Sequence, residues 1–221
     1  LTMQSNELTR REVLTSAGAL LSDLVICGAR PAMAAAAEPS RASKPTAAAA
    51  GRITIGKDMT VNRLGFGAMR VTGEGIWGEP PDVAEAKRLL RLAVDLGVDF
   101  IDTADAYGPD VSERLIAEAL YPYPKSLVIA TKGGIVRPAR EKWERNGRPA
   151  HLRAACEASL KRLNCDVIDL YQLHWPTRNV PMFGNLYHDP KNDRPVTPID
   201  EQLRGLQRLV QAGKVRHVGV S

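Results

Sequence analysis

Five apolar runs of strand length recur from residue 64 onward, and they alternate with longer amphipathic segments. Such an alternation of strand and helix patterns is typical of α/β folds with a parallel sheet. The predicted strands lie in the segments 64–69, 98–101, 126–130, 167–171 and 215–220, and the predicted helices in the segments 81–96, 112–120, 149–163 and 198–212. The sequence therefore predicts an α/β fold with five parallel strands, preceded by a hairpin at 53–61.

Four of these strands run into short polar segments. They are 102–108 (DTADAYG), 130–134 (ATKGG), 171–176 (YQLHWP) and 218–221 (VGVS). The carboxyl ends of parallel strands meet at one edge of a sheet, and in (β/α)8 barrels this edge carries the chemistry. We therefore expect the side chains of Asp102, Tyr107, Lys132 and His174 to converge there.

The loops at this edge differ in length. Lys132 follows Asp102 by 30 positions, the length of one βα unit, whereas His174 follows Lys132 by 42. The extra length falls in the loop 133–148. A second insert at 177–196 is expected to form a lid on the substrate side, because long loops at such an edge are commonly functional. It carries Met182, Phe183, Tyr187 and His188.

The four polar side chains suit the reduction of a carbonyl group. We expect the Asp102 carboxylate to hold Lys132 cationic, and a cation beside a phenol lowers the phenol's pKa from about 10. Tyr107 would then donate a proton to a developing alkoxide, while His174 donates a hydrogen bond to the same oxygen. A cofactor would supply the hydride. Each residue alone also fits a structural role, so the prediction depends on their occurring together.

These segments resemble those of the aldo-keto reductase family. The stretch 100–108 (FIDTADAYG), followed by Ser112-Glu113, resembles the family's first signature. Thr131-Lys132-Gly133 and Leu173-His174-Trp175-Pro176 resemble its catalytic Lys and His segments. The stretch 213–221 (GKVRHVGVS) is similar to the strand whose terminal Ser binds the nicotinamide carboxamide. The resemblance covers residues 52–221.

The resemblance implies a TIM barrel and the NADPH-dependent reduction of an aldehyde or ketone to an alcohol. It implies that Tyr107 is the general acid, that Asp102 and Lys132 tune its acidity, and that His174 orients the substrate. It further implies that Ser221, Asp102 and Met69 contact the nicotinamide end of NADPH. The expected partner is a small carbonyl compound.

The predicted barrel is incomplete in this chain. Residues 52–221 are fewer than the about 250 residues and eight strands of such barrels, so about five of eight βα units are represented. The loops after strands seven and eight, which commonly bind phosphate, are not among them. Three interpretations stay open: a reductase given in part, a truncated chain without activity, and a cofactor-sensing binding subunit.

The first 51 residues have a different character. Residues 1–34 are expected to be a twin-arginine export signal, because Arg10-Arg11 precedes an apolar stretch and Ala32-Met33-Ala34 fits an A-x-A cleavage pattern. Asp23 interrupts the apolar stretch, which is too short to span a bilayer. We therefore expect a periplasmic or exported protein, and a cytoplasmic one if the segment is an uncleaved tail. Residues 35–51, rich in Ala and Pro, are expected to form a flexible linker.

Composition argues against several other classes of function. The formal net charge is +5, but the basic residues are scattered and no nucleic-acid-binding signature accompanies them. The three cysteines form no Cys-x-x-Cys pair or Cys/His cluster that suggests a metal site. We expect no nucleic-acid partner, no membrane span, no metal, and a monomer or weak homo-oligomer.

Overall fold

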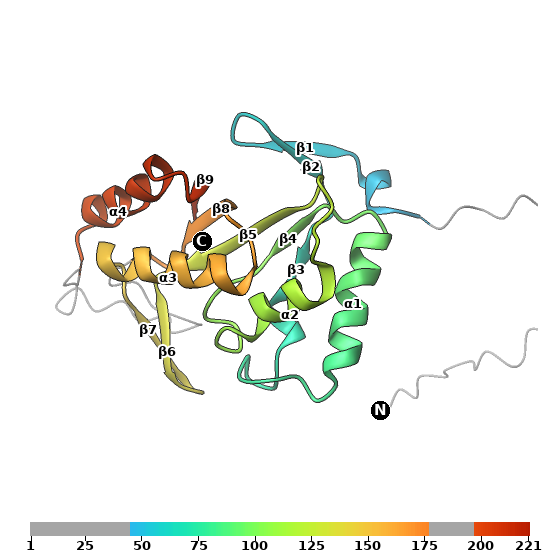
Figure 1. Ribbon diagram of the computed structural model, residues 1–221, viewed down its shortest axis with the longest axis horizontal. Coiled ribbons are helices and arrows are strands. Elements are labelled where there is room, and N and C mark those ends of the chain that lie inside the picture. Colours follow the sequence, from blue (N-terminus) through green and yellow to red (C-terminus); the bar gives the residue numbers. More distant parts are fainter. Residues whose placement is uncertain (1–44, 177–196) are drawn as a thin grey trace, which may run out of the picture. The chain divides into compact units, whose positions relative to one another are not determined.

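A computed structural model describes residues 45–176 and 197–221. Its largest sheet has five parallel strands in the order β3-β4-β5-β8-β9 (Figure 1). Their bounds are β3 (Phe66–Gly67), β4 (Phe100–Asp102), β5 (Val128–Gly133), β8 (Ile168–Leu173) and β9 (Val215–Val220). Each strand joins the sheet beside the strand that precedes it in this set, as in a (β/α)8 barrel. The predicted α/β fold with five parallel strands is confirmed.

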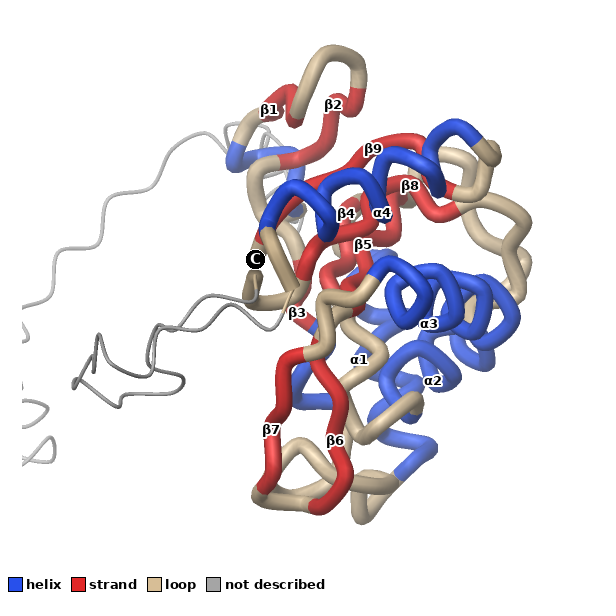
Figure 2. The backbone as a smooth tube through the Cα atoms, turned by 90° about the vertical axis from the view of Figure 1, so that its left-hand side faces the viewer, coloured by secondary structure: helices blue, strands red, loops and turns tan. Residues whose placement is uncertain are grey.

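Four α-helices connect these strands in the described part of the chain. They are α1 (Val83–Asp95), α2 (Val111–Leu120), α3 (Pro149–Arg162) and α4 (Ile199–Gln211). Helices α1, α2 and α3 lie on one side of the sheet (Figure 2). Local signals fix their ends: the Asp82 side chain accepts a hydrogen bond from the Glu85 amide at 2.8 Å, and Pro149 opens α3.

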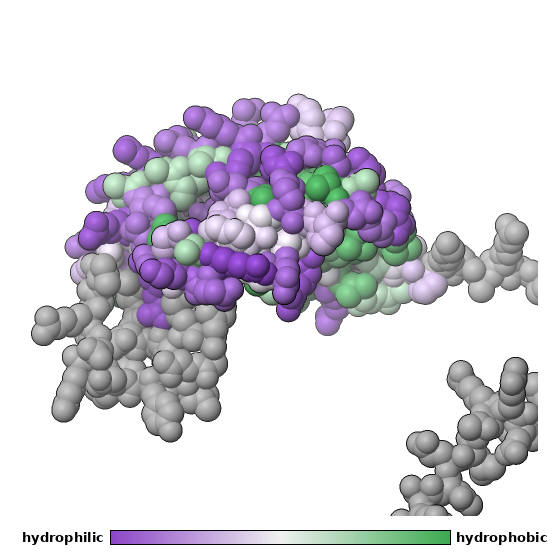
Figure 3. All heavy atoms as spheres, turned by 90° about the horizontal axis from the view of Figure 1, so that it is seen from below, coloured by the Kyte–Doolittle hydropathy of each residue, from purple (hydrophilic) through white to green (hydrophobic). Residues whose placement is uncertain are grey.

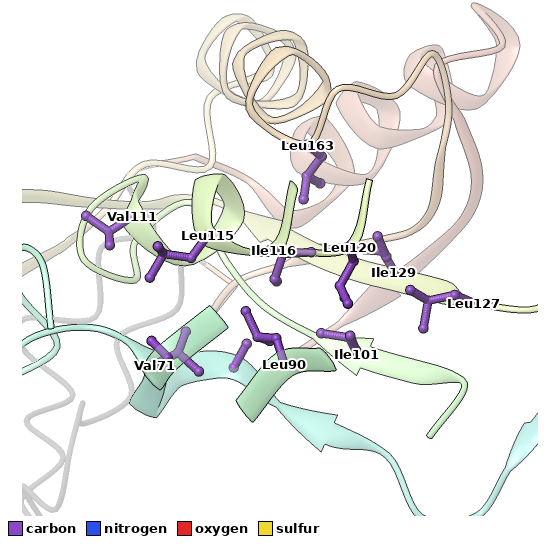
Figure 4. Close-up of a cluster of buried hydrophobic side chains, with 12 residues drawn as sticks. Val71, Leu90, Ile101, Val111, Leu115, Ile116, Leu120, Leu127, Ile129 and Leu163 are labelled. Carbon is purple, nitrogen blue, oxygen red and sulfur yellow. The ribbon is translucent and has the colours of Figure 1, made fainter. Parts of the chain in front are cut away.

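The helix-covered face of the sheet holds the main core. Its larger cluster lies between α1, α2 and the strands β4 and β5 (Figure 4). Leu90, Ile101, Leu115 and Ile116 are fully buried there. A second cluster joins α3 and α4 to β8 and β9, and it includes Leu152, Cys156, Tyr171, Leu173, Leu206, Leu209 and Val215. These apolar contacts fix the strands whose ends carry the polar segments.

The buried face of α1 differs from the predicted one. The sequence predicts a face with Ala84, Leu89, Leu90, Leu92 and Ala93, but the side chains that pack inward are Ala86, Leu90 and Ala93. Leu89 and Leu92 are exposed. The spacing i, i+4, i+7 defines a narrow stripe on a helix, and residues one position away from it lie on the flank.

Two β-hairpins lie at opposite ends of the structure (Figure 2). The predicted hairpin at 53–61 is formed by β1 (Arg52–Ile55) and β2 (Met59–Asn62). The second, β6 (Ile135–Ala139) with β7 (Lys142–Arg145), lies within the loop 133–148, where the sequence analysis predicts no strand. Pro138 inside β6 and the charged residues around it conceal the strand pattern.

The folded part begins before Arg52. Part of the segment predicted as a linker forms a short 3-10 helix, η1 (Ala47–Ala50), and Ala47 is buried against Ala93 and Val98. The Ala47 amide also donates to the Leu96 carbonyl at 2.7 Å. A small side chain and a free backbone donor are enough to dock this segment, although its composition resembles that of a linker. The rest of the predicted linker up to residue 44, and the predicted signal at 1–34, lie outside the described residues.

The surface is mostly polar where Figure 3 shows it, with apolar areas between the hydrophilic side chains. Within residues 45–176 and 197–221, no helix combines the length and the apolar character needed to cross a membrane. The edge strand β9 carries two exposed apolar side chains, Val218 and Val220.

Candidate active site

The strand register places three polar side chains on the face of the sheet opposite the helices. Asp102 pairs with Ala130 of β5, and Lys132, two residues further along, pairs with Gln172 of β8. Because side chains alternate between the two faces of a strand, Asp102, Lys132 and Gln172 share one face. All three lie toward the carboxyl ends of their strands.

These three side chains are joined by hydrogen bonds. The Lys132 ammonium donates to Asp102 Oδ2 at 2.5 Å and to the Thr103 carbonyl oxygen at 2.8 Å. The Gln172 amide donates to the second carboxylate oxygen, Asp102 Oδ1, at 2.9 Å. Lys132 is buried, and burial lowers the pKa of its ammonium while the Asp102 carboxylate opposes that shift. The carboxylate is thereby held on both oxygens and oriented toward Lys132.

Tyr107 lies in the turn that follows β4, with its side chain 8% exposed. Lys132 Nζ is 3.4 Å from Tyr107 Oη and 5.1 Å from the centre of the phenol ring. Contrary to the expected lowering, the pKa of Tyr107 is raised to about 12. Burial is the largest cause, and the negative charges of Asp102 and Asp105 add to it. The phenol therefore keeps its proton at neutral pH.

His174 follows β8 and meets Tyr107 from the neighbouring strand end. The two rings are perpendicular, with their centres 5.8 Å apart. Burial and the charge of Lys132 lower the pKa of His174 to about 3, so the imidazole is neutral at neutral pH. Its backbone amide donates to the Gly133 carbonyl at 2.9 Å, and its Nδ1 has no hydrogen-bond partner among the described residues. A neutral imidazole carries one N–H donor without a net charge.

The structure thus brings Asp102, Tyr107, Lys132 and His174 together at one strand edge. The two other predicted contact residues lie at ends of neighbouring strands. Met69 belongs to the short 3-10 helix η2 (Ala68–Val71), directly after β3. Ser221 follows β9, where its amide donates to the Leu173 carbonyl and its own carbonyl accepts from the Trp175 amide.

A buried ionic network supports this edge from the helix-covered face. Glu113 of α2 is fully buried, and it accepts hydrogen bonds from Thr131 Oγ1 at 2.5 Å and from Arg162 Nε at 2.7 Å. Thr131 directly precedes Lys132 in β5. Ser112, next to Glu113, donates to the Ala68 carbonyl at 2.9 Å and so holds the start of η2. The network ties α2 and α3 to the strand ends that carry the site.

One glycine in the predicted Lys segment is required by packing. A Cβ atom at Gly133 would lie 1.9 Å from the Tyr171 hydroxyl oxygen, which is closer than any side chain allows. Tyr171 is fully buried, so it has little room to move aside. Gly133 therefore leaves room for the Tyr171 side chain of β8 to pack against β5, the strand that carries Lys132.

No motif in the sequence predicts a role for Gln172. The spacing could have identified it, because a residue two positions before His174 lies on the same face as Asp102 and Lys132. The predicted lid at 177–196, with Met182, Phe183, Tyr187 and His188, lies outside the described residues. Among residues 45–176 and 197–221, no group of three or more His, Cys, Asp or Glu side chains is arranged to hold a metal ion.

Sequence comparisons agree with the resemblance noted above. The model of the Aldo/keto reductase family matches residues 63–221. An uncharacterized oxidoreductase of Schizosaccharomyces pombe is 46% identical over 175 residues, which are 79% of this chain and 51% of that protein. Pyridoxine 4-dehydrogenase of Escherichia coli is 40% identical over 162 residues, which are 73% of this chain and 53% of that protein. The chain spans about half the length of these curated relatives.

Solved structures show the same arrangement of strands and helices. Glycerol dehydrogenase of Gluconobacter oxydans matches 78% of this chain and 48% of its own length, with a TM-score of 0.61 and 38% sequence identity. The holo form of an aldo-keto reductase from Bacillus halodurans matches 77% of this chain and 49% of its own length, with a TM-score of 0.61 and 30% identity. These matches confirm the predicted fold, part of a (β/α)8 barrel.

Proposed function

Since the chain belongs to the aldo-keto reductase family, we propose that the protein reduces an aldehyde or ketone to an alcohol with hydride from NADPH. One observation carries this proposal. A protonated phenol, an ammonium group 3.4 Å from it and a neutral imidazole beside its ring lie together at the carboxyl edge of the sheet. These groups can donate a proton and orient an oxygen atom. Carbonyl reduction requires both in addition to hydride transfer.

The residues at this edge fit the nicotinamide end of such a cofactor. A carboxamide needs both donors and acceptors, and the Ser221 hydroxyl, the Asp102 carboxylate and the Gln172 amide offer both kinds. Met69 adds an apolar side chain that suits contact with a ring. We propose that these residues hold the nicotinamide end. When bound, the cofactor supplies the hydride.

Tyr107 is the proton donor in this proposal. With a pKa of about 12, its phenol is protonated throughout the neutral range, and an alkoxide is a stronger base than a phenolate. The proton therefore passes from Tyr107 Oη to the substrate oxygen as that oxygen gains negative charge. The Lys132 ammonium, 3.4 Å away, stabilises the phenolate that remains. Lys132 thus acts on the product of proton transfer rather than by lowering the pKa of the resting phenol.

His174 and Asp102 complete the set. A neutral His174 donates a ring N–H to the carbonyl oxygen, and it orients that oxygen toward Tyr107 without competing for the proton. The Asp102 carboxylate compensates the charge of the buried Lys132, whose desolvation would otherwise favour the neutral amine.

The experiment is a turnover assay with the full-length protein. Loss of NADPH absorbance is followed with a panel of small aldehydes and ketones, for the wild type and for Tyr107→Phe. We expect carbonyl-dependent oxidation of NADPH by the wild type, and for Tyr107→Phe a loss of about 10²–10⁴-fold in kcat, as for other acid–base groups. NADPH affinity, measured by fluorescence, should be unchanged. Equal turnover by both proteins would refute the role of Tyr107.

We also propose that residues 1–34 direct export by the twin-arginine route, and that the mature protein is periplasmic. Arg10-Arg11, the apolar stretch after it and the Ala-rich segment that fits cleavage support this. The test fuses residues 1–34 to a folded reporter in a bacterial host and follows its location. A signal that works should fail when Arg10 and Arg11 are both replaced by Lys. A reporter that stays cytoplasmic with the native segment would contradict the proposal.

A further inference from the structure

The β6–β7 hairpin carries a buried guanidinium group. Arg137 of β6 is 8% exposed, and its guanidinium carbon lies 3.6 Å from the ring centre of Trp143 on β7. The ring centre of a second indole, Trp77 from the loop before α1, lies 5.3 Å away. Contact with aromatic rings stabilises a planar cation that has lost water. Arg137 therefore joins the hairpin to the loop that contains Trp77.

Arg137 donates hydrogen bonds to carbonyl oxygens in three separate segments. Its Nη1 atom donates to the Ile76 oxygen at 3.1 Å and to the Ala106 oxygen at 3.3 Å. Its Nη2 atom donates to the Gly75 oxygen at 3.5 Å and to the Arg140 oxygen. One side chain thus connects the 75–76 loop, the backbone before Tyr107 and the turn of the hairpin.

The loop that carries Tyr107 is also fixed on its other side. The Gly108 amide donates to the Ile76 oxygen at 3.3 Å, and the Gly78 amide donates to the Gly108 oxygen at 2.6 Å. Gly108 has a φ of 98°, a conformation that favours glycine. Tyr107 therefore lies between Ala106 and Gly108. The Ala106 carbonyl accepts from Arg137, and the Gly108 amide donates to the same Ile76 oxygen that Arg137 contacts.

The chemistry of this position favours arginine over other residues. Arg137 forms no ion pair with a carboxylate among the described residues. Its Nη1 and Nη2 atoms are directed at backbone oxygens, while its buried Nε has no hydrogen-bond partner there. A buried charge without a carboxylate is costly unless its hydrogen bonds are made. A lysine has a compact ammonium that cannot stack on Trp143 and reach several carbonyl groups at once. The residue is thus placed to define backbone geometry.

We propose that Arg137 is a positioning residue that fixes the backbone of Tyr107 relative to Lys132. The inference rests on the proposed function for its effect on turnover, and on the contacts above for its effect on structure. Proton transfer depends steeply on geometry, and a displacement of about 1 Å at a reacting group lowers rates by about 10²-fold. Lys132 comes from β5, so a shift of the Tyr107 loop alone changes the distance between their reacting atoms.

The experiment compares Arg137→Met and Arg137→Lys with Arg140→Met in the full-length protein. Arg140 is the matched control, since it lies on the same hairpin but is partly exposed and pairs with Glu74 and Glu141 at the surface. Amide hydrogen exchange is measured for the segment 103–110. We expect about tenfold faster exchange there in Arg137→Met, because a buried clamp on the backbone is lost. Arg140→Met should exchange like the wild type.

Kinetics separate positioning from a general loss of stability. For Arg137→Met, kcat should fall by about 10–10² while the KM for NADPH stays unchanged. Arg137→Lys keeps the charge and should give an intermediate kcat, and it carries the test if Arg137→Met does not fold. Unchanged exchange at 103–110 in both Arg137 variants, or equal kcat losses in the Arg137 and Arg140 variants, would overturn the inference. If the wild type reduces no carbonyl compound, the proposed function fails, and the exchange comparison alone decides on Arg137.

Discussion

The two faces of the parallel sheet differ in the kind of side chain that the same strands place on them. On the helix-covered face, Ile101, Thr131, Tyr171 and Leu173 are fully buried. On the opposite face, the side chain of Asp102 is 34% exposed, while Lys132 is buried beside it. One face is a closed core, and the other carries charged groups at its edge.

The charged site is held in place by residues that pack on the other face of the same strands. Along β5, Thr131 is fixed by Glu113 on the covered face, so the next residue, Lys132, points to the opposite face from a fixed backbone. Leu173, buried in the core of the covered face, directly precedes His174 in the same way. The groups proposed for chemistry are therefore positioned by neighbours that pack on the other side of the sheet. Substitutions on the covered face should act on stability, and those on the opposite face on turnover.

The largest effect on stability is expected for Glu113→Ala on the covered face. The substitution removes the buried partner of Thr131 and one of the two carboxylates paired with Arg162, while Asp110 remains. Breaking a buried pair from one side costs about 3–5 kcal/mol. The free energy of unfolding, measured with denaturant, should fall by this amount.

A matched control lies on the same helix. Glu118 forms ion pairs with Lys87 and Arg114 at the surface, and exposed pairs contribute about 0–1 kcal/mol. Glu118→Ala should therefore leave the free energy of unfolding within about 1 kcal/mol of the wild type. Equal losses for the two variants would show that the buried network contributes no more to stability than a surface pair.

A smaller effect should appear in the pH dependence of stability. The pKa of His174 is about 3 when folded and about 6.5 when unfolded, so the unfolded chain binds more protons between these values. His174 therefore contributes stability above about pH 6.5 that is lost as the pH falls, by at most about 1.4 kcal/mol per pH unit. Unfolding is measured at about pH 7 and pH 5 for the wild type and for His174→Gln. The variant should lose less stability on acidification, and parallel losses would contradict the burial of His174.

The smallest effect is expected for Gln172→Met on the opposite face. The substitution removes one hydrogen bond to Asp102 Oδ1 but leaves the bond from Lys132 to Oδ2. A hydrogen bond of this kind contributes about 1 kcal/mol, and because Lys132 still holds Asp102 Oδ2 we expect kcat to fall by at most about fivefold. A loss as large as that of Tyr107→Phe would mean that Gln172 has a direct part in the chemistry.

The fold could be predicted from the sequence wherever it depends on a local pattern of apolar and capping residues. The strands that end at Asp102, Gly133 and Leu173 follow from apolar runs, and the helices between them follow from capping residues and periodicity. The β6–β7 hairpin was missed because Pro138 and surrounding charges hide its alternation. Composition places Ala47 in a linker, because its burial depends on packing against Ala93 and Val98, which are distant in the sequence.

The site was predictable in membership but not in electrostatics. Strand ends and spacing indicate that Asp102, Tyr107, Lys132 and His174 meet, and the hydrogen bonds and ring contact place them together. The predicted direction of the Tyr107 pKa shift is wrong, since burial and the charges of Asp102 and Asp105 raise the pKa of the phenol. Such a balance depends on solvent exposure, which motifs do not encode. The contacts of Arg137 could not be predicted either, because they are made to backbone oxygens of segments distant in the sequence, which no motif encodes.

We propose that Tyr107 and Lys132 act as one unit in proton transfer. It is tested most directly by kcat for Tyr107→Phe, Lys132→Met and the double variant of the full-length protein, with NADPH affinity as the control. We expect each single substitution to lower kcat by about 10²–10⁴, and the double variant to lose no more than the more impaired single one. Losses that multiply in the double variant, or wild-type turnover in either single variant, would contradict the account.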